Sequence, residues 1–297
     1  MDLLHDFGGD GPVVHLAHAN GFPPGAYRRL AESLTPHYHV IALAARPLWP
    51  GSRPESAPTW RPMAEDLIAE LDRLGLRAIV GVGHSLGGLL TLWAGILRPD
   101  LFRAVVLIDP VILPPSWLVA LRLLRGLGLK QRQPLVQSAL HRRRTWPSRQ
   151  ACFERYRSRP HFARWSDAAL WDYVESGTRA NDDGQVELIY PADWEAHIFA
   201  TTPTDIWRDV PHLHTPALIL RGEGSDIFLP AAQARLAHRL PLAQFVTISG
   251  AGHLLPMERP AEIGAAVHDW LNSGSSIADP SAADPPAAGL QSLAPPV

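Results

Sequence analysis

The sequence has little cysteine and no long hydrophobic run, and these absences exclude several classes of protein. Cys152 is the only cysteine among 297 residues, which excludes an internal disulfide, a thiolate zinc site and an iron–sulfur cluster. No apolar run approaches the roughly 18–20 residues of a membrane span. The first residues, Met1 to Asp6, lack the basic and apolar regions of a secretory signal. We therefore expect a cytoplasmic protein without a membrane span.

A large excess of one charge is also missing. The formal net charge is −2 with histidine neutral, so electrostatics gives no reason to expect nucleic acid as a partner. Two His-x-His pairs, His37 with His39 and His212 with His214, could suggest a metal site. Since no third ligand can be placed beside either pair, the prediction is that neither a metal nor an organic cofactor is required. The oligomeric state stays open.

Apolar, β-branched segments alternate with segments of helical period in two stretches of the chain, which is typical of a parallel sheet covered by helices. Hydrophobic residues make up 46% of the chain, enough for a sizeable core. The expected strands are 13–17, 40–43, 78–82, 104–108, 217–220 and 244–248, and the expected helices are 26–34, 63–74, 86–97 and 261–271. The sequence predicts an α/β fold with a mostly parallel central sheet flanked by helices.

The alternation stops between residues 114 and 209, where leucine-rich and tryptophan-rich helical stretches are broken by prolines. We interpret 114–209 as a helical cap inserted between two parts of one core, 1–113 and 210–272. The last segment, 273–297, has almost nothing to bury and is predicted to be disordered.

Charge within the cap is segregated. The stretch from Arg122 to Arg164 holds a dozen basic residues and one acid, Glu154, whereas Asp167 to Glu195 is mostly acidic. Two interpretations remain open. The two halves could pair with each other or form solvated faces, or the basic half could form a lid that attracts anionic substrates or surfaces.

The most informative motif is Gly83-His84-Ser85-Leu86-Gly87, which lies directly between a predicted strand and a predicted helix. This Gly-x-Ser-x-Gly pattern needs that context, because the tight strand-to-helix turn leaves no room for a Cβ at its flanking positions. The turn exposes the serine hydroxyl at the carboxyl end of the sheet, where ligands of open α/β sheets bind. Ser85 is the predicted nucleophile.

A serine nucleophile needs a base, and the base needs an acid to orient it. The candidate base is His253, which follows the last predicted strand. For the acid we prefer Asp226, which follows the next-to-last strand and gives the chain order Ser, Asp, His. Asp109 also leaves a strand at the carboxyl edge and is the alternative, and Glu223 is a third candidate.

Acyl transfer also needs two donors for a developing oxyanion. One is the backbone N–H of Leu86, at the start of a helix where such groups have no acceptor within the helix. The other is expected in the loop His18 to Pro23, after the first strong strand. The strand length favours the backbone N–H of Asn20, and a register shift of two residues would make the donor Phe22.

This set of residues resembles the α/β-hydrolase fold superfamily, in particular its serine esterase and lipase-like members with a helical cap. The resemblance spans residues 2–272. It implies hydrolysis of a small-molecule carboxylic ester of short to medium acyl chain through a Ser–His–Asp triad and an acyl-enzyme. The serine at position 85 disfavours the dehalogenases and epoxide hydrolases of the superfamily, which use aspartate. Carbon–carbon bond hydrolases, lyases, other acyl hydrolases and a slow or inactive binding module stay open.

Overall fold

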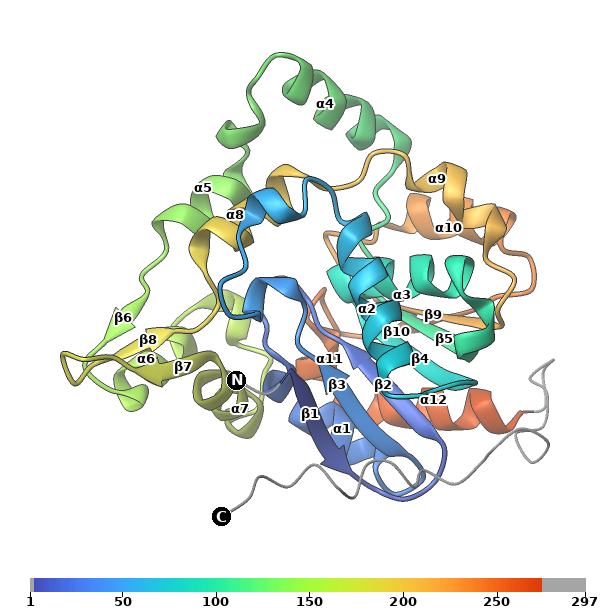
Figure 1. The fold of residues 1–297 in the computed structure, drawn as a ribbon, viewed down its shortest axis with the longest axis horizontal. Helices are drawn as coiled ribbons and strands as arrows, with labels where there is room; N and C mark the ends of the chain where they lie inside the picture. The colour runs from blue at the N-terminus through green and yellow to red at the C-terminus, as the bar shows by residue number, and fades with distance from the viewer. Residues whose placement is uncertain (1–2, 274–297) are drawn as a thin grey trace.

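Seven strands form the central sheet of the computed structural model, which describes residues 3–273 (Figure 1). They are Leu4–Gly8 (β1), Val13–Ala17 (β2), His39–Leu43 (β3), Ile79–His84 (β4), Phe102–Ile108 (β5), Ala217–Gly222 (β9) and Gln244–Ile248 (β10). Their order across the sheet is β1-β3-β2-β4-β5-β9-β10. The edge strand β1 is antiparallel to β3, and every other neighbouring pair is parallel. The predicted mostly parallel α/β sheet is confirmed.

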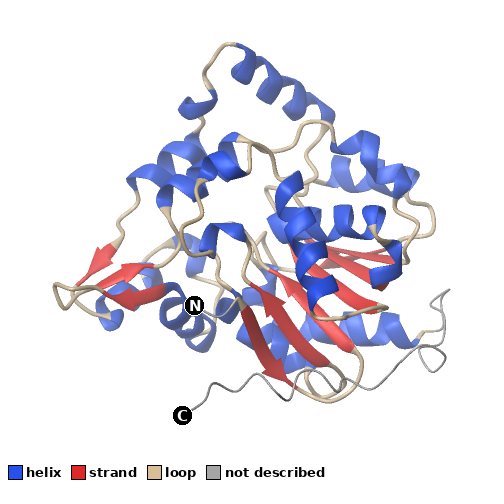
Figure 2. Ribbon diagram, in the orientation of Figure 1, coloured by secondary structure: helices blue, strands red, loops and turns tan. Residues whose placement is uncertain are grey.

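Helices cover both faces of this sheet, as Figure 2 shows. The core helices are Arg28–Leu34 (α1), Arg61–Arg73 (α2), Leu86–Leu97 (α3), Pro230–Arg239 (α10), Leu255–Glu258 (α11) and Pro260–Asn272 (α12). Apolar residues of α2, α3 and α10 form one buried cluster with the sheet, and residues of α1, α11 and α12 form another.

The two clusters follow from the period of two along each strand. In β5, Val105 and Leu107 belong to the first cluster, whereas Val106 and Ile108 belong to the second. All four side chains are fully buried. A strand covered on both faces reads as a continuous apolar run, which is why the sequence identifies β5 clearly.

The segment between β5 and β9 is helical for most of its length but also contains a small sheet. Its helices are Pro115–Gly126 (α4), Pro134–His141 (α5), Arg149–Arg157 (α6), Asp167–Gly177 (α7), Ala192–Ala200 (α8) and Ile206–Asp209 (α9). The strands Thr145–Trp146 (β6), Thr178–Ala180 (β7) and Val186–Leu188 (β8) form an antiparallel sheet in the order β6-β8-β7. The expectation of a purely helical cap is therefore incomplete, because strands of two or three residues leave no periodic signal.

The predicted strands and helices appear in the predicted order on both sides of this insertion, and the structure adds β1, α10 and α11, which were not predicted. Whether 1–113, 114–209 and 210–272 behave as separate units stays a prediction. The predicted disordered tail, 273–297, lies outside the described residues except for Ser273. Within residues 3–273, no helix is long and apolar enough to cross a membrane.

Asp209 joins the end of the insertion to two core helices. Its Oδ2 accepts hydrogen bonds from Arg61 Nη2 of α2 at 2.6 Å and from Trp93 Nε1 of α3 at 2.9 Å. The Arg61 guanidinium also lies over the Trp93 ring, 4.9 Å from its centroid. Because Trp93 is fully buried, its indole N–H has no access to water as a substitute acceptor.

We expect Asp209→Ala to lower the free energy of unfolding by about 1–3 kcal/mol, because a buried donor loses its acceptor. Urea unfolding followed by circular dichroism measures this change. The matched control is Asp205→Ala, which removes an exposed carboxylate four residues earlier. Equal stability of the two variants would contradict a specific role for Asp209.

Candidate active site

Ser85 lies at a strained turn between β4 and α3. Its backbone has φ 56° and ψ −113°, a left-handed conformation that a serine adopts only when its surroundings require it. Two close approaches impose the turn: a Cβ on Gly83 would lie 2.3 Å from the carbonyl oxygen of Gly87, and one on Gly87 would lie 2.0 Å from that of Ala17. The predicted position of Ser85 at the carboxyl edge of the sheet agrees with this geometry.

Ser85, His253 and Asp109 form one hydrogen-bonded line. His253 Nε2 lies 3.0 Å from Ser85 Oγ, and His253 Nδ1 lies 2.7 Å from Asp109 Oδ2. An ionised carboxylate only accepts, so the neutral ring carries its proton on Nδ1 and leaves Nε2 free to accept the Ser85 hydroxyl proton. Asp109 is fully buried, and its Oδ1 and Oδ2 also accept from the Gly222 N–H and the Ser225 hydroxyl.

The structure corrects the preferred acid. Asp226 does not contact the His253 ring, because the turn after β9 directs its side chain into solvent. The preceding residue, Ser225, turns inward instead: its hydroxyl donates to Asp109 and accepts from the Ile227 and Phe228 N–H groups. Asp109, which leaves β5 with φ 43°, occupies the position beside the histidine.

The third candidate acid, Glu223, holds the loops together at a distance from the ring. Its Oε2 accepts from the Ser249 hydroxyl at 2.8 Å and from the Gly250 N–H at 2.9 Å. These bonds, the Gly250 N–H first, lower the pKa of the Glu223 carboxyl. On the other side of the same loop, the Gly252 N–H donates to Glu258 Oε2 at 2.7 Å. Two carboxylates therefore fix the segment that carries His253.

A second buried line of hydrogen bonds runs behind Ser85 and connects three loops. His84 Nε2 lies 2.9 Å from the His253 carbonyl oxygen, which can only accept, so His84 Nδ1 accepts from the Tyr27 hydroxyl at 2.7 Å. The Tyr27 oxygen in turn accepts from the Ala19 N–H at 2.9 Å. Burial, with the nearby His253, holds the pKa of His84 well below its usual value, which keeps the ring neutral.

Sequence reasoning missed three of these supporting residues, Tyr27, His84 and Ser225. His84 carried a usable signal, since it lies inside the serine motif on a fully buried strand, where a polar ring needs partners. Tyr27 and Ser225 carried none, because their partners are distant in the sequence.

The loop after β2 forms a tight turn. The Phe22 N–H donates to the Ala19 carbonyl oxygen at 3.2 Å, across Gly21 with φ 81°. The Asn20 side chain points toward the insertion, where its Nδ2 donates to the Glu195 carbonyl oxygen at 3.1 Å. Of the two predicted donors in this loop, Phe22 has its N–H engaged within the turn.

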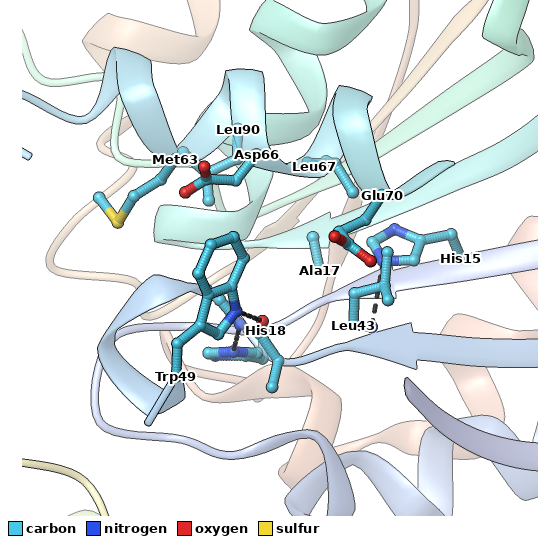
Figure 3. Close-up of a pocket in the computed structure, with 12 residues that line it drawn as sticks. His15, Ala17, His18, Leu43, Trp49, Met63, Asp66, Leu67, Glu70 and Leu90 are labelled. Atoms are coloured by element: carbon cyan, nitrogen blue, oxygen red, sulfur yellow. Dashed lines mark hydrogen bonds between the residues drawn. The ribbon is translucent and has the colours of Figure 1, made fainter. Parts of the chain in front are cut away.

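Two more buried histidines stabilise this edge of the sheet. His15 Nε2 accepts from the Leu43 N–H and His18 Nε2 from the Ala45 N–H, which tie β2 to the end of β3. Figure 3 shows both rings beside a cavity of about 30 Å³ under α2. Burial lowers the pKa of His15 to about 3 and that of His18 to about 4, so both are neutral at neutral pH.

Aromatic rings of the insertion pack over the loop after β2. The Phe22 ring lies 5.1 Å from Tyr173 and 6.1 Å from Trp165, measured between centroids, and Phe162 lies 4.9 Å from Trp165. A separate cavity of about 430 Å³ opens beside His253, between segment 160–164 and the loops after β9 and β10, with Asp226 in its wall. Within the described residues, no group of three His, Cys, Asp or Glu could hold a metal ion.

The mostly parallel sheet, the serine turn after a central strand and the histidine after the last strand together define the α/β-hydrolase class of proteins. A model of the alpha/beta hydrolase family matches residues 13–266. The chain therefore belongs to this family.

Relatives and solved structures of similar extent are named as hydrolases of several kinds. The chain is 26% identical to RutD of Pseudomonas syringae pv. syringae, named as a proposed carbamate hydrolase, over 91% of this chain and 99% of RutD. It is 25% identical to a thermophilic esterase from Thermogutta terrifontis, with a TM-score of 0.64 over 92% of this chain and 93% of the esterase. E-2-(acetamidomethylene)succinate hydrolase has the same fold, with a TM-score of 0.74 at 22% identity, over 90% of this chain and 94% of that one.

The three buried neutral histidines predict sensitivity to acid. Below about pH 6.5 the unfolded chain binds protons at His15, His18 and His84 that the folded chain does not bind, so the free energy of unfolding falls as the pH is lowered. Each histidine contributes a slope of up to about 1.4 kcal/mol per pH unit. Urea unfolding measured between neutral pH and the mildly acidic range gives the total slope.

The variant His15→Gln is expected to reduce this slope by about one proton, whatever its effect on stability at neutral pH. The control His141→Gln removes an exposed histidine and should leave the slope unchanged. A His15→Gln slope equal to that of the wild type would show that His15 is protonated in the folded chain.

Proposed function

We propose that the protein is a serine hydrolase of carboxylic esters with short to medium acyl chains. The observation that carries this proposal is the hydrogen-bonded line from Ser85 through His253 to Asp109. A neutral serine hydroxyl is a weak nucleophile, and a base whose second nitrogen is held by a buried carboxylate is the arrangement that activates it.

In the proposed reaction Ser85 Oγ attacks the ester carbonyl carbon while His253 Nε2 takes the hydroxyl proton. Asp109 stabilises the imidazolium that forms and keeps the ring in its orientation. The tetrahedral intermediate collapses as His253 returns the proton to the leaving alcohol, which yields an acyl-enzyme. A water molecule then gives a proton to His253 as its oxygen attacks the acyl carbon, and His253 returns this proton to Ser85 Oγ as the acid leaves.

We propose the backbone N–H groups of Leu86 and Asn20 as the oxyanion donors. Leu86 begins α3, where the first N–H groups lack acceptors within the helix. Asn20 is favoured over Phe22, because the Phe22 N–H donates to Ala19. The bond from Ala19 to Tyr27 supports the loop from behind, so Tyr27 and His84 act as positioning residues.

The substrate proposal rests on the rings around the oxyanion loop. Trp165 and Tyr173 pack against Phe22 and give this loop apolar, aromatic surroundings that suit an acyl group, and the esterase relative supports this assignment. A carbamate ester is the second candidate, because the charged pair Arg142–Glu195 lies beside Gly21 and gives the same loop a polar neighbour. The similarity to RutD supports this alternative.

Ser85→Ala is expected to lower kcat/KM by about 10³-fold or more on p-nitrophenyl esters, since it removes the attacking atom. Release of p-nitrophenol from a series between acetate and palmitate measures this effect and the preferred chain length in the wild type. A wild type inactive on every ester would refute ester hydrolysis, and a carbamate substrate would then be tested in its place.

Asp109→Asn is expected to lower kcat by about 10³–10⁴-fold with little change in KM, because an amide cannot stabilise the imidazolium. The matched control, Asp226→Asn, should stay within about two-fold of the wild type, since Asp226 is exposed and His253 Nδ1 bonds to Asp109 instead. The same ester assay serves both variants, with circular dichroism to confirm folding. The opposite ranking would restore Asp226 as the acid.

A further inference from the structure

We propose that α4 and the segment after it form a docking surface for an anionic lipid bilayer. The proposal is independent of the proposed ester hydrolysis. Eight large apolar side chains are exposed in the described residues, and six of them lie in α4, α5 and the short link between them. They are Trp117, Val119, Leu123, Leu127, Leu135 and Leu140. Such a concentration marks an interaction site, whereas single exposed leucines are ordinary.

The orientation of α4 is the reverse of an ordinary surface helix. Val119, Leu123 and Leu127 follow each other at intervals of four residues, so they share one face. Leu123 is 63% exposed and Leu127 is 71% exposed. Figure 1 shows α4 at the top of the molecule, away from the central sheet. The face that meets solvent is therefore the apolar one.

The opposite face of α4 is already occupied. Leu118 is buried and Leu121 packs on the core. Arg122 and Arg125 donate hydrogen bonds to the backbone carbonyl oxygens of Thr204 and Thr202, which attach α4 to the end of the insertion. These bonds and contacts hold the inner face of α4. The helix could turn its exposed apolar face toward the rest of the protein only by breaking them, so closure as a lid does not explain that face.

The positive charge around α4 indicates which kind of partner binds its exposed apolar face. Between Pro110 and Phe153 the sequence has eight lysine and arginine residues and no acid, in a chain with a formal net charge of −2, and of these eight Arg142 is paired with Glu195. Lys130 and Arg132, which follow α4, are both exposed. A second copy of this surface would bring like charges together, which is unfavourable. An anionic bilayer instead offers an apolar interior for the leucines and negative head groups for the cations.

Vesicle flotation tests the proposal with phosphatidylcholine alone and with phosphatidylcholine mixed with phosphatidylglycerol. We expect binding to the mixed vesicles only. The double variant Leu123→Gln with Leu127→Gln should reduce the vesicle partition coefficient at least about ten-fold, because two apolar side chains no longer gain burial. The double variant Lys130→Gln with Arg132→Gln should reduce it about twenty-five-fold, at about five-fold for each charge.

The matched control is Leu242→Gln, which removes a leucine that is 96% exposed in the turn between α10 and β10. This control should bind as the wild type does, and thermal unfolding should confirm that all variants fold. Absence of flotation, equal flotation with neutral vesicles, or flotation that the α4 variants do not weaken would each overturn the proposal. So would a dimer that the α4 variants dissociate in sedimentation velocity without any vesicle binding.

Discussion

The hydrogen bond between His84 and the His253 carbonyl oxygen is the interaction on which the rest of the site depends. It joins the turn that presents the serine to the loop that presents the base, and through Tyr27 it reaches the loop after β2. The strands β2 and β4 are paired directly, whereas β10 lies beyond β5 and β9, so no backbone ladder joins the His253 loop directly to the serine turn. The His84 imidazole, kept neutral by burial, makes this direct connection, while Glu223 and Glu258 hold the same loop from its other side.

Much of the fold could be predicted from the sequence because each core element repeats its signal over several residues. The strands β5 and β10 and the helix α3 lie where periodicity places them. The small sheet of the insertion could not be predicted, because β6, β7 and β8 are only two or three residues long. The exposed apolar face of α4 could not be predicted either, since the same pattern normally indicates a buried face.

Part of the candidate site could also be predicted from the sequence, and part of it could not. Ser85 follows from its motif and His253 from its place after the last strand, and the structure brings the two side chains together. The acid was a choice between two aspartates that leave neighbouring strands at one edge of the sheet. Only the conformation of each loop separates them: Asp109 turns inward with a positive φ, and Asp226 faces solvent because Ser225 takes the inner position. Nothing in the sequence indicates which of the two aspartates faces the histidine.

The place of Asp109 has a consequence for the order in which the protein is made. Ser85 and Asp109 both precede the insertion between β5 and β9, whereas His253 follows it and two further strands. During translation the serine and the carboxylate can therefore reach their strand ends long before any base exists to join them. The nascent chain therefore leaves the ribosome with a Ser85 hydroxyl that no base activates. Ser85 becomes a nucleophile only when the last strand of the sheet is in place and His253 reaches it.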